Sequence, residues 1–116
     1  VAAFTANLDA LVEVLVRLQG DRRRVLLVGH PHREHLEPGA DGRRWNRFVA
    51  EAARRVAARR GVAWFDAAPG LEAAFGATPA AYYWQGDMHF SFAGLEAYGT
   101  RLGAEIGRRL AAAGAG

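Results

Sequence analysis

Asp87 and His89 are the two residues of this sequence whose types and spacing indicate chemistry. They stand in the segment YYWQGDMHFSFAG, residues 82–94. If residues 87–89 are extended, both side chains project to the same side of the backbone. The carboxylate can then accept a hydrogen bond from Nδ1–H of His89, which leaves Nε2 free to act as a base. A base oriented in this way is half of the apparatus for acyl transfer through a hydroxyl nucleophile.

The nucleophile that such a base serves is not evident in the sequence. The chain contains no cysteine, and Ser91 is its only serine. Ser91 directly precedes a segment with helical periodicity, so we expect its side chain to cap that helix rather than to attack a substrate. An Asp-x-His sequence in a loop is also typical of a hydrogen-bonded turn without catalytic function, and this second interpretation stands beside the first.

The apolar pattern predicts the elements that must position the pair. Apolar residues three and four positions apart predict helices, in residues 4–18, 44–60, 69–75 and 92–113. Residues 24–29 and 62–66 are short, continuous apolar runs, as in strands that are covered on both faces. Alternating helices and strands indicate an α/β fold with a parallel sheet. Because two strands are fewer than a sheet usually has, we expect further strands upstream of this chain.

A loop rich in His, Pro and Gly is expected at residues 30–42, directly after the first strand. Long loops inside compact domains tend to carry function. His30, His32, His35 and Glu34 have the donor types of a zinc site, but their spacing matches no strong zinc signature. We therefore expect this loop to be exposed beside the site and to hold no metal.

Two further features have both a functional and a structural interpretation. Tyr82, Tyr83 and Trp84 can form a wall on which a sugar stacks, or they can pack as core and lid. Asp66 ends the second predicted strand, where we expect it to cap the following turn rather than to act as a second catalytic carboxylate. The glycines form no phosphate-binding loop, so nucleotide binding has no support.

Composition limits the class of protein. The 116 residues form at most one domain, and 51% hydrophobic with 23% charged residues is typical of a globular chain. No apolar run reaches the roughly 18 residues that cross a bilayer. All 15 basic residues are arginines, scattered over several predicted elements with acidic residues between them, so we expect no nucleic-acid surface. The absence of cysteine excludes disulfides and leaves the compartment, cytoplasmic or extracytoplasmic, open; no cofactor is indicated.

The block DMHFSFAG (residues 87–94), followed by a patterned terminal helix, resembles the C-terminal block of the SGNH (GDSL-type) hydrolase family. The preceding order, RVLLVGHP, a helix and then VAWFDAAPGL, is similar to the later part of that family. The resemblance implies a three-layer α/β/α sandwich with a parallel, flavodoxin-like sheet. Residues 1–116 would be the C-terminal part of one such domain, without its N-terminal strands and nucleophile block.

The resemblance also implies an activity, which is ester hydrolysis or acyl transfer on lipids, carbohydrates or small esters without a metal. His89 would be the general base and Asp87 its partner. The serine nucleophile and the oxyanion-hole glycine and asparagine of the family have no match in this chain. We therefore predict an ester hydrolase or O-acyltransferase with a Ser-His-Asp triad, acting on a small-molecule or carbohydrate ester.

The spacing of the pair distinguishes branches of that family. The commonest family pattern places the Asp three positions before the His, where this chain has Gly86. Asp87 lies two positions before His89, which is similar to the branch that resembles alginate and peptidoglycan O-acetyltransferase domains. The matching residues are Tyr82, Tyr83, Asp87, His89, Phe90 and Gly94. The alternative hypothesis is a non-catalytic flavodoxin-like module that binds a carbohydrate or a protein through its aromatic segment.

Overall fold

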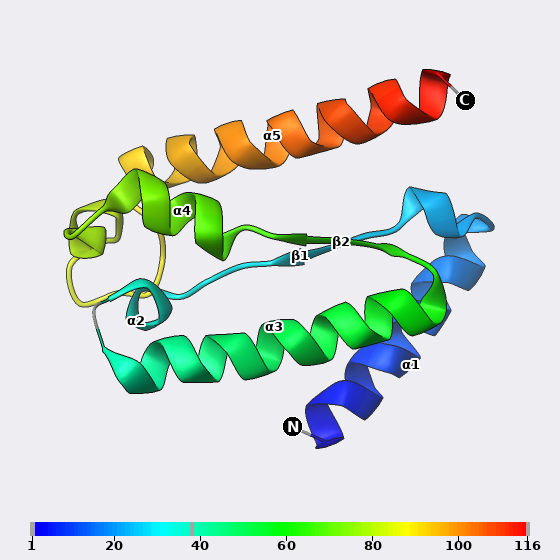
Figure 1. Cartoon of the computed structure of the whole chain (residues 1–116), viewed down its shortest axis with the longest axis horizontal. Helices are drawn as coiled ribbons and strands as arrows, with labels where there is room; N and C mark the ends of the chain where they lie inside the picture. Colours follow the sequence, from blue (N-terminus) through cyan, green and yellow to red (C-terminus); the bar gives the residue numbers. More distant parts are fainter. Residues whose placement is uncertain (1, 38, 116) are drawn as a thin grey trace.

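The computed structural model of the chain describes residues 2–37 and 39–115, and most of these are helical (Figure 1). The three long helices are α1 (Ala2–Gln19), α3 (Ala40–Arg60) and α5 (Phe92–Ala115). The short helices are α2 (Arg33–Leu36) and α4 (Ala68–Phe75), with single 3-10 turns at η1 (Arg22–Arg24) and η2 (Pro79–Tyr82). The strands are β1 (Leu26–Gly29) and β2 (Ala63–Asp66).

The two strands pair in parallel and lie at the centre of the molecule. Leu26 pairs with Ala63 and Gly29 with Asp66, so the strands are in register along their whole length. In Figure 1, α3 and α1 lie on one side of this ribbon and α4 and α5 on the other. Because parallel strands end at the same edge, the loop after β1 and helix α4 after β2 begin side by side.

The predicted three-layer α/β/α sandwich with a parallel sheet is wrong for the part of the chain that the structure describes. Helices dominate, and β1 and β2 form a sheet of two strands. The physical reason is that only two segments have short, continuous apolar runs, whereas the other apolar residues recur at helical spacing. Every residue of β1 and β2 is partly exposed, so these strands are not covered as the sequence predicted.

The types of the other elements are confirmed, with shifts of a few residues at their ends. The loop predicted at residues 30–42 is wrong in part, because α2 forms within it and α3 begins at Ala40. Leu36 explains the extra turn of helix, since its side chain is buried in the core. The residues after β1 are therefore held by packing rather than left as one long irregular loop.

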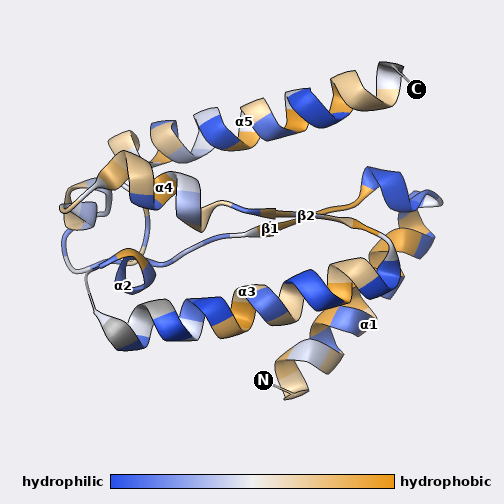
Figure 2. Ribbon diagram, in the orientation of Figure 1, coloured by the Kyte–Doolittle hydropathy of each residue, from blue (hydrophilic) through white to orange (hydrophobic). Residues whose placement is uncertain are grey.

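The core consists of two apolar clusters, one at each end of the sheet. Figure 2 shows hydrophobic residues along both strands, which lie between these clusters. The first cluster joins α2 and α4 to the segment that follows η2, through Leu36, Leu71, Phe75, Tyr83 and Phe90. The second joins α1 and α3 to the strands, through Val12, Val25, Val56, Ala57 and Val62. The first cluster thus underlies the Asp87–His89 segment.

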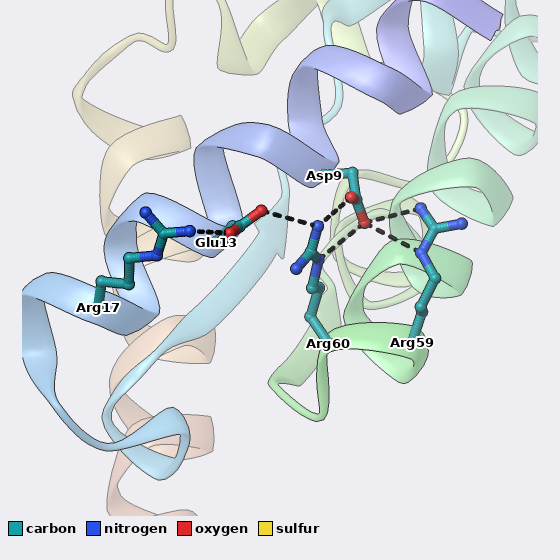
Figure 3. A network of polar contacts seen from close by, with 5 residues as sticks. All are labelled: Asp9, Glu13, Arg17, Arg59 and Arg60. Atoms are coloured by element: carbon teal, nitrogen blue, oxygen red, sulfur yellow. Dashed lines mark hydrogen bonds and ion pairs between the residues drawn. The ribbon is translucent and has the colours of Figure 1, made fainter.

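A network of ion pairs fastens α1 to the end of α3 (Figure 3). The Asp9 carboxylate accepts hydrogen bonds from Arg59 Nη2 at 2.7 Å and from Arg60 Nε at 3.0 Å. Glu13 accepts from Arg60 Nη2 at 3.2 Å and also pairs with Arg17. The hydrogen bond from Arg60, with that from Arg59, lowers the pKa of Asp9 from 3.8 to about 2. The charged form of Asp9 is therefore favoured by folding.

Replacing Asp9 by Asn is expected to make the fold less sensitive to acid. A carboxyl whose pKa falls on folding stabilises the folded state above its unfolded pKa, and this contribution is lost as the pH falls from about 4 to about 2. Thermal unfolding followed by circular dichroism over this range measures the effect. The Tm of the wild type should fall more steeply than that of Asp9→Asn. Glu72→Gln, which removes an exposed carboxylate on α4, is the control; equal slopes for wild type and Asp9→Asn would contradict the prediction.

Candidate catalytic dyad

A tight hairpin carries the two predicted residues. The amide of Asp87 donates to the carbonyl of Trp84 at 3.1 Å, which closes a four-residue turn. Gly86, the third residue of that turn, has φ of 70°, the conformation that a type II turn requires there and that glycine adopts without strain. Beyond the turn, Trp84 N donates to His89 O at 3.0 Å. The backbone of residues 84–89 is thereby fixed.

The hairpin is anchored by an aromatic pair on its inner face. Tyr83 and Phe90 lie opposite each other in an antiparallel bridge, and both are buried with ring centroids 4.8 Å apart. The Tyr83 hydroxyl donates to the carbonyl of Pro31 at 3.1 Å, and burial raises the pKa of this hydroxyl. Side chains alternate along an extended chain, so the neighbours Trp84 and His89 are placed on the outer side. The anchor therefore turns His89 toward solvent.

Asp87 and His89 form the contact that the sequence predicts. Nδ1 of His89 lies 2.5 Å from Oδ1 of Asp87, and the same oxygen accepts from the backbone amide of His89 at 3.0 Å. That backbone amide, followed by the imidazole, lowers the pKa of Asp87, so the carboxylate is charged at neutral pH. The His89 side chain is 85% exposed, and no described residue forms a hydrogen bond with its Nε2. This geometry is that of an oriented base, while a catalytic function stays a prediction.

Ser91 caps α5, as expected from its position. Its Oγ accepts from the amide of Gly94 at 3.3 Å, and its carbonyl accepts from the amide of Leu95 at 2.8 Å. Only a glycine fits at position 94, because an added Cβ would lie 2.1 Å from the carbonyl oxygen of Tyr82. Ser91 and Gly94 belong to the block that resembles the family, and both are explained by the structure alone, because α5 begins there and packs against the hairpin.

The histidine segment lies beside the dyad, as predicted, but most of it is buried or only partly exposed, so the expectation of a fully exposed loop is wrong. Nδ1 of His32 is 3.2 Å from Sδ of Met88, and the amide of His32 donates to Nδ1 of His35 at 3.1 Å. The His30 ring packs against Phe90 at 5.0 Å, and partial burial there lowers its pKa. Within residues 2–37 and 39–115, no group of three or more His, Asp or Glu side chains is placed to hold a metal ion.

The aromatic residues next to the dyad divide between core and surface. Tyr83 is buried, and Tyr82 stacks on Phe75 with ring centroids 4.0 Å apart, so both pack as core and lid. Trp84 remains 48% exposed and touches Phe92, which is 77% exposed, with ring centroids at 5.5 Å. The apolar periodicity of the sequence indicates Phe92 only as the first residue of a helix. The sequence does place an aromatic residue on each side of the Asp-x-His segment, Trp84 before it and Phe92 after it, and this spacing could have indicated an aromatic surface beside His89.

Neither Asp66 nor the cleft beside the histidines extends the dyad. Asp66 accepts from the amide of Ala68 at 3.0 Å, which confirms the predicted capping of the following turn. A cleft of about 340 Å³ between α1, α3 and β1 is lined by His30, His32 and His35, but not by Asp87 or His89. The dyad thus lies on an exposed hairpin and not inside this cleft.

Comparisons of the chain with protein-family models, curated proteins and solved structures found no match. In the described part of the chain, no helix combines the length and the apolar character needed to cross a membrane. The function is therefore argued from the geometry of the hairpin and from the sequence resemblance.

Replacing Ser91 by Ala is expected to lower the free energy of unfolding by about 1 kcal/mol, because the amide of Gly94 loses its acceptor. Urea denaturation followed by circular dichroism measures this loss. Ser91→Thr keeps a capping hydroxyl and should retain most of the stability. A Ser91→Ala protein as stable as the wild type would show that the hydroxyl does not cap α5.

Proposed function

We propose that Asp87 and His89 are the base half of a Ser-His-Asp triad in an ester hydrolase or O-acyltransferase. The observation that carries this proposal is the 2.5 Å contact between Asp87 Oδ1 and His89 Nδ1, together with the exposure of the imidazole. Asp87 accepts a hydrogen bond from Nδ1–H of His89, so the proton stays on Nδ1 and the lone pair of Nε2 is available to a hydroxyl.

In the reaction, Nε2 of His89 takes the proton of the hydroxyl as its oxygen attacks the ester carbonyl. The charged Asp87 stabilises the imidazolium that forms. His89 then donates this proton to the departing alkoxide, and the acyl group remains on the nucleophile. Water or an acceptor alcohol, deprotonated in turn by Nε2, attacks the acyl group and releases it as an acid or as a new ester, and His89 returns the proton to the oxygen of the departing nucleophile.

The proposed nucleophile is a serine other than Ser91. Ser91, the only serine of the sequence, is engaged in capping α5. The family resemblance assigns the attack to a serine that has no match among these residues. The proposal therefore includes a serine on a separate segment that approaches Nε2 of His89 from the solvent side.

The substrate class is supported by the surface around His89. Trp84 and Phe92 present exposed aromatic rings within the same hairpin and helix start. Such rings pack against the apolar face of a sugar or against an acyl chain. Together with the two-position spacing of Asp87 and His89, this surface favours an ester of a carbohydrate or small molecule, and transfer of an O-acetyl group over plain hydrolysis.

A second candidate function is a non-catalytic module that binds a carbohydrate or a protein. The observation that favours it is the exposure of Trp84 and Phe92, because aromatic residues are more frequent at binding surfaces than on the rest of a protein surface. In this case the Asp87–His89 contact would only stabilise the turn. The two candidates differ in what the loss of the imidazole does.

Replacing His89 by Ala, in the protein as its gene encodes it, is expected to reduce turnover of p-nitrophenyl acetate about a thousandfold or more. Asp87→Asn should reduce it about a hundredfold or more, because the imidazole loses the acceptor that fixes its tautomer. His35→Ala, which removes an imidazole from the neighbouring segment, is the control and should retain turnover.

Two outcomes would contradict the proposed base or favour the binding module. If His89→Ala left turnover at the wild-type rate, the proposed base would be wrong. If neither the wild type nor the variants hydrolysed the ester while Trp84→Ala abolished binding of an oligosaccharide, the module would replace the enzyme as the proposed function.

A further inference from the structure

Four arginines from three elements gather around one pocket at the opposite edge of the sheet. Arg17 comes from α1, Arg22 from η1, and Arg59 and Arg60 from the last turn of α3. They line a pocket of about 300 Å³ together with Glu13 and Val16. The elements η1 and α3 lead into the amino ends of β1 and β2, whereas the dyad follows their carboxyl ends. Arginines that are scattered in the sequence are thus brought together by the fold.

The pocket carries more positive than negative charge. Asp9 pairs with Arg59 and Arg60, and Glu13 with Arg60 and Arg17, as Figure 3 shows. These two carboxylates are shared by three guanidinium groups. Arg22 adds a fourth, and no described residue forms an ion pair or hydrogen bond with its guanidinium. Four guanidinium groups against two carboxylates leave a surplus of two positive charges.

The unpaired Arg22 is exposed, and its side chain lies close to the residue that ends α3. Asp21 caps η1 by accepting from the amide of Arg23 at 3.0 Å, which orients this single turn. A Cβ at Gly61, the residue that ends α3, would lie 3.6 Å from both Cδ and Nη1 of Arg22. The side chain therefore lies over the end of α3, next to Arg59 and Arg60. Like charges that line one pocket repel one another, and a bound anion would relieve that repulsion.

We infer that this pocket binds a small, multiply charged oxyanion of the phosphate class, such as a pyrophosphate or a phosphate monoester. The planar fork of a guanidinium group donates two parallel hydrogen bonds to paired oxygens, which suits phosphate geometry. The volume of about 300 Å³ accommodates a small ligand. This site is separate from the dyad and does not depend on the proposed acyl chemistry.

An extended nucleic-acid surface fits the same region less well. Such a surface needs a continuous basic face that follows a phosphate backbone. Here four carboxylates lie between the arginines and form ion pairs with most of them, namely those of Asp9, Glu13, Asp21 and Glu51. Four of the arginines converge on one pocket, with Arg24 beside it as a further charge that pairs with no described residue, and this clustering favours a small anion.

Isothermal titration of the chain with inorganic pyrophosphate at about 0.15 M ionic strength, where distant charges are screened, tests the inference. Replacing Arg22 by Gln should weaken binding about tenfold, because a charge-assisted hydrogen bond is lost. Arg24→Gln removes the same charge two positions away, from a residue that does not line the pocket, and should leave the affinity within about twofold. Since neither guanidinium supports another residue by a hydrogen bond, both variants should keep the Tm of the wild type.

Three results would overturn the inference. The first is the absence of pyrophosphate binding by the wild type, and the second is an equal loss of affinity in Arg22→Gln and Arg24→Gln, since either would exclude a specific pocket. The third is tighter binding of a single-stranded oligonucleotide than of pyrophosphate, with both substitutions weakening the oligonucleotide binding equally. That result would show a general basic surface for nucleic acid.

Discussion

The parallel pairing of β1 with β2 is the constraint on which the rest of the structure depends. It brings Gly29 beside Asp66, although they are far apart in the sequence, so that the segments after both strands leave the same edge. The hairpin packs against these segments through Tyr83 and Phe90, and there it presents the dyad. At the other edge, the same pairing brings η1 against the end of α3 and so gathers the arginines. The short two-stranded sheet therefore positions both the Asp87–His89 dyad and the arginine pocket.

The dyad itself is a product of local backbone geometry supported by a buried anchor. The turn with Gly86 places Asp87 where its carboxylate meets both the amide and the imidazole of His89. The Tyr83–Phe90 pair keeps the hairpin from rotating, since both rings are buried and in contact. A base on so exposed a hairpin accelerates a reaction only when the nucleophile and the substrate exclude water from it. Otherwise water screens and solvates the charges of the carboxylate and the imidazolium.

Local features were predictable from the sequence, and features that depend on distant contacts were not. Helix and strand types follow from apolar periodicity, and the Asp87–His89 contact follows from a spacing of two. Which aromatic residue faces solvent depends on the register of Tyr83 opposite Phe90, which no local pattern specifies. The arginine pocket joins residues about forty positions apart through tertiary packing. The sandwich prediction failed because it extended a family resemblance beyond the two strand-like segments that the chain contains.

The central claim is that Asp87 holds His89 in the tautomer with the proton on Nδ1 and with Nε2 unprotonated. Long-range proton–nitrogen correlation NMR, recorded while the imidazole is neutral, distinguishes the two tautomers directly. We expect a protonated Nδ1 and a bare Nε2 for His89 in the wild type, and a shift toward the other tautomer in Asp87→Asn. A wild-type His89 with its proton on Nε2 would show that Asp87 does not orient a base, since Nε2 would then have no lone pair for the nucleophile.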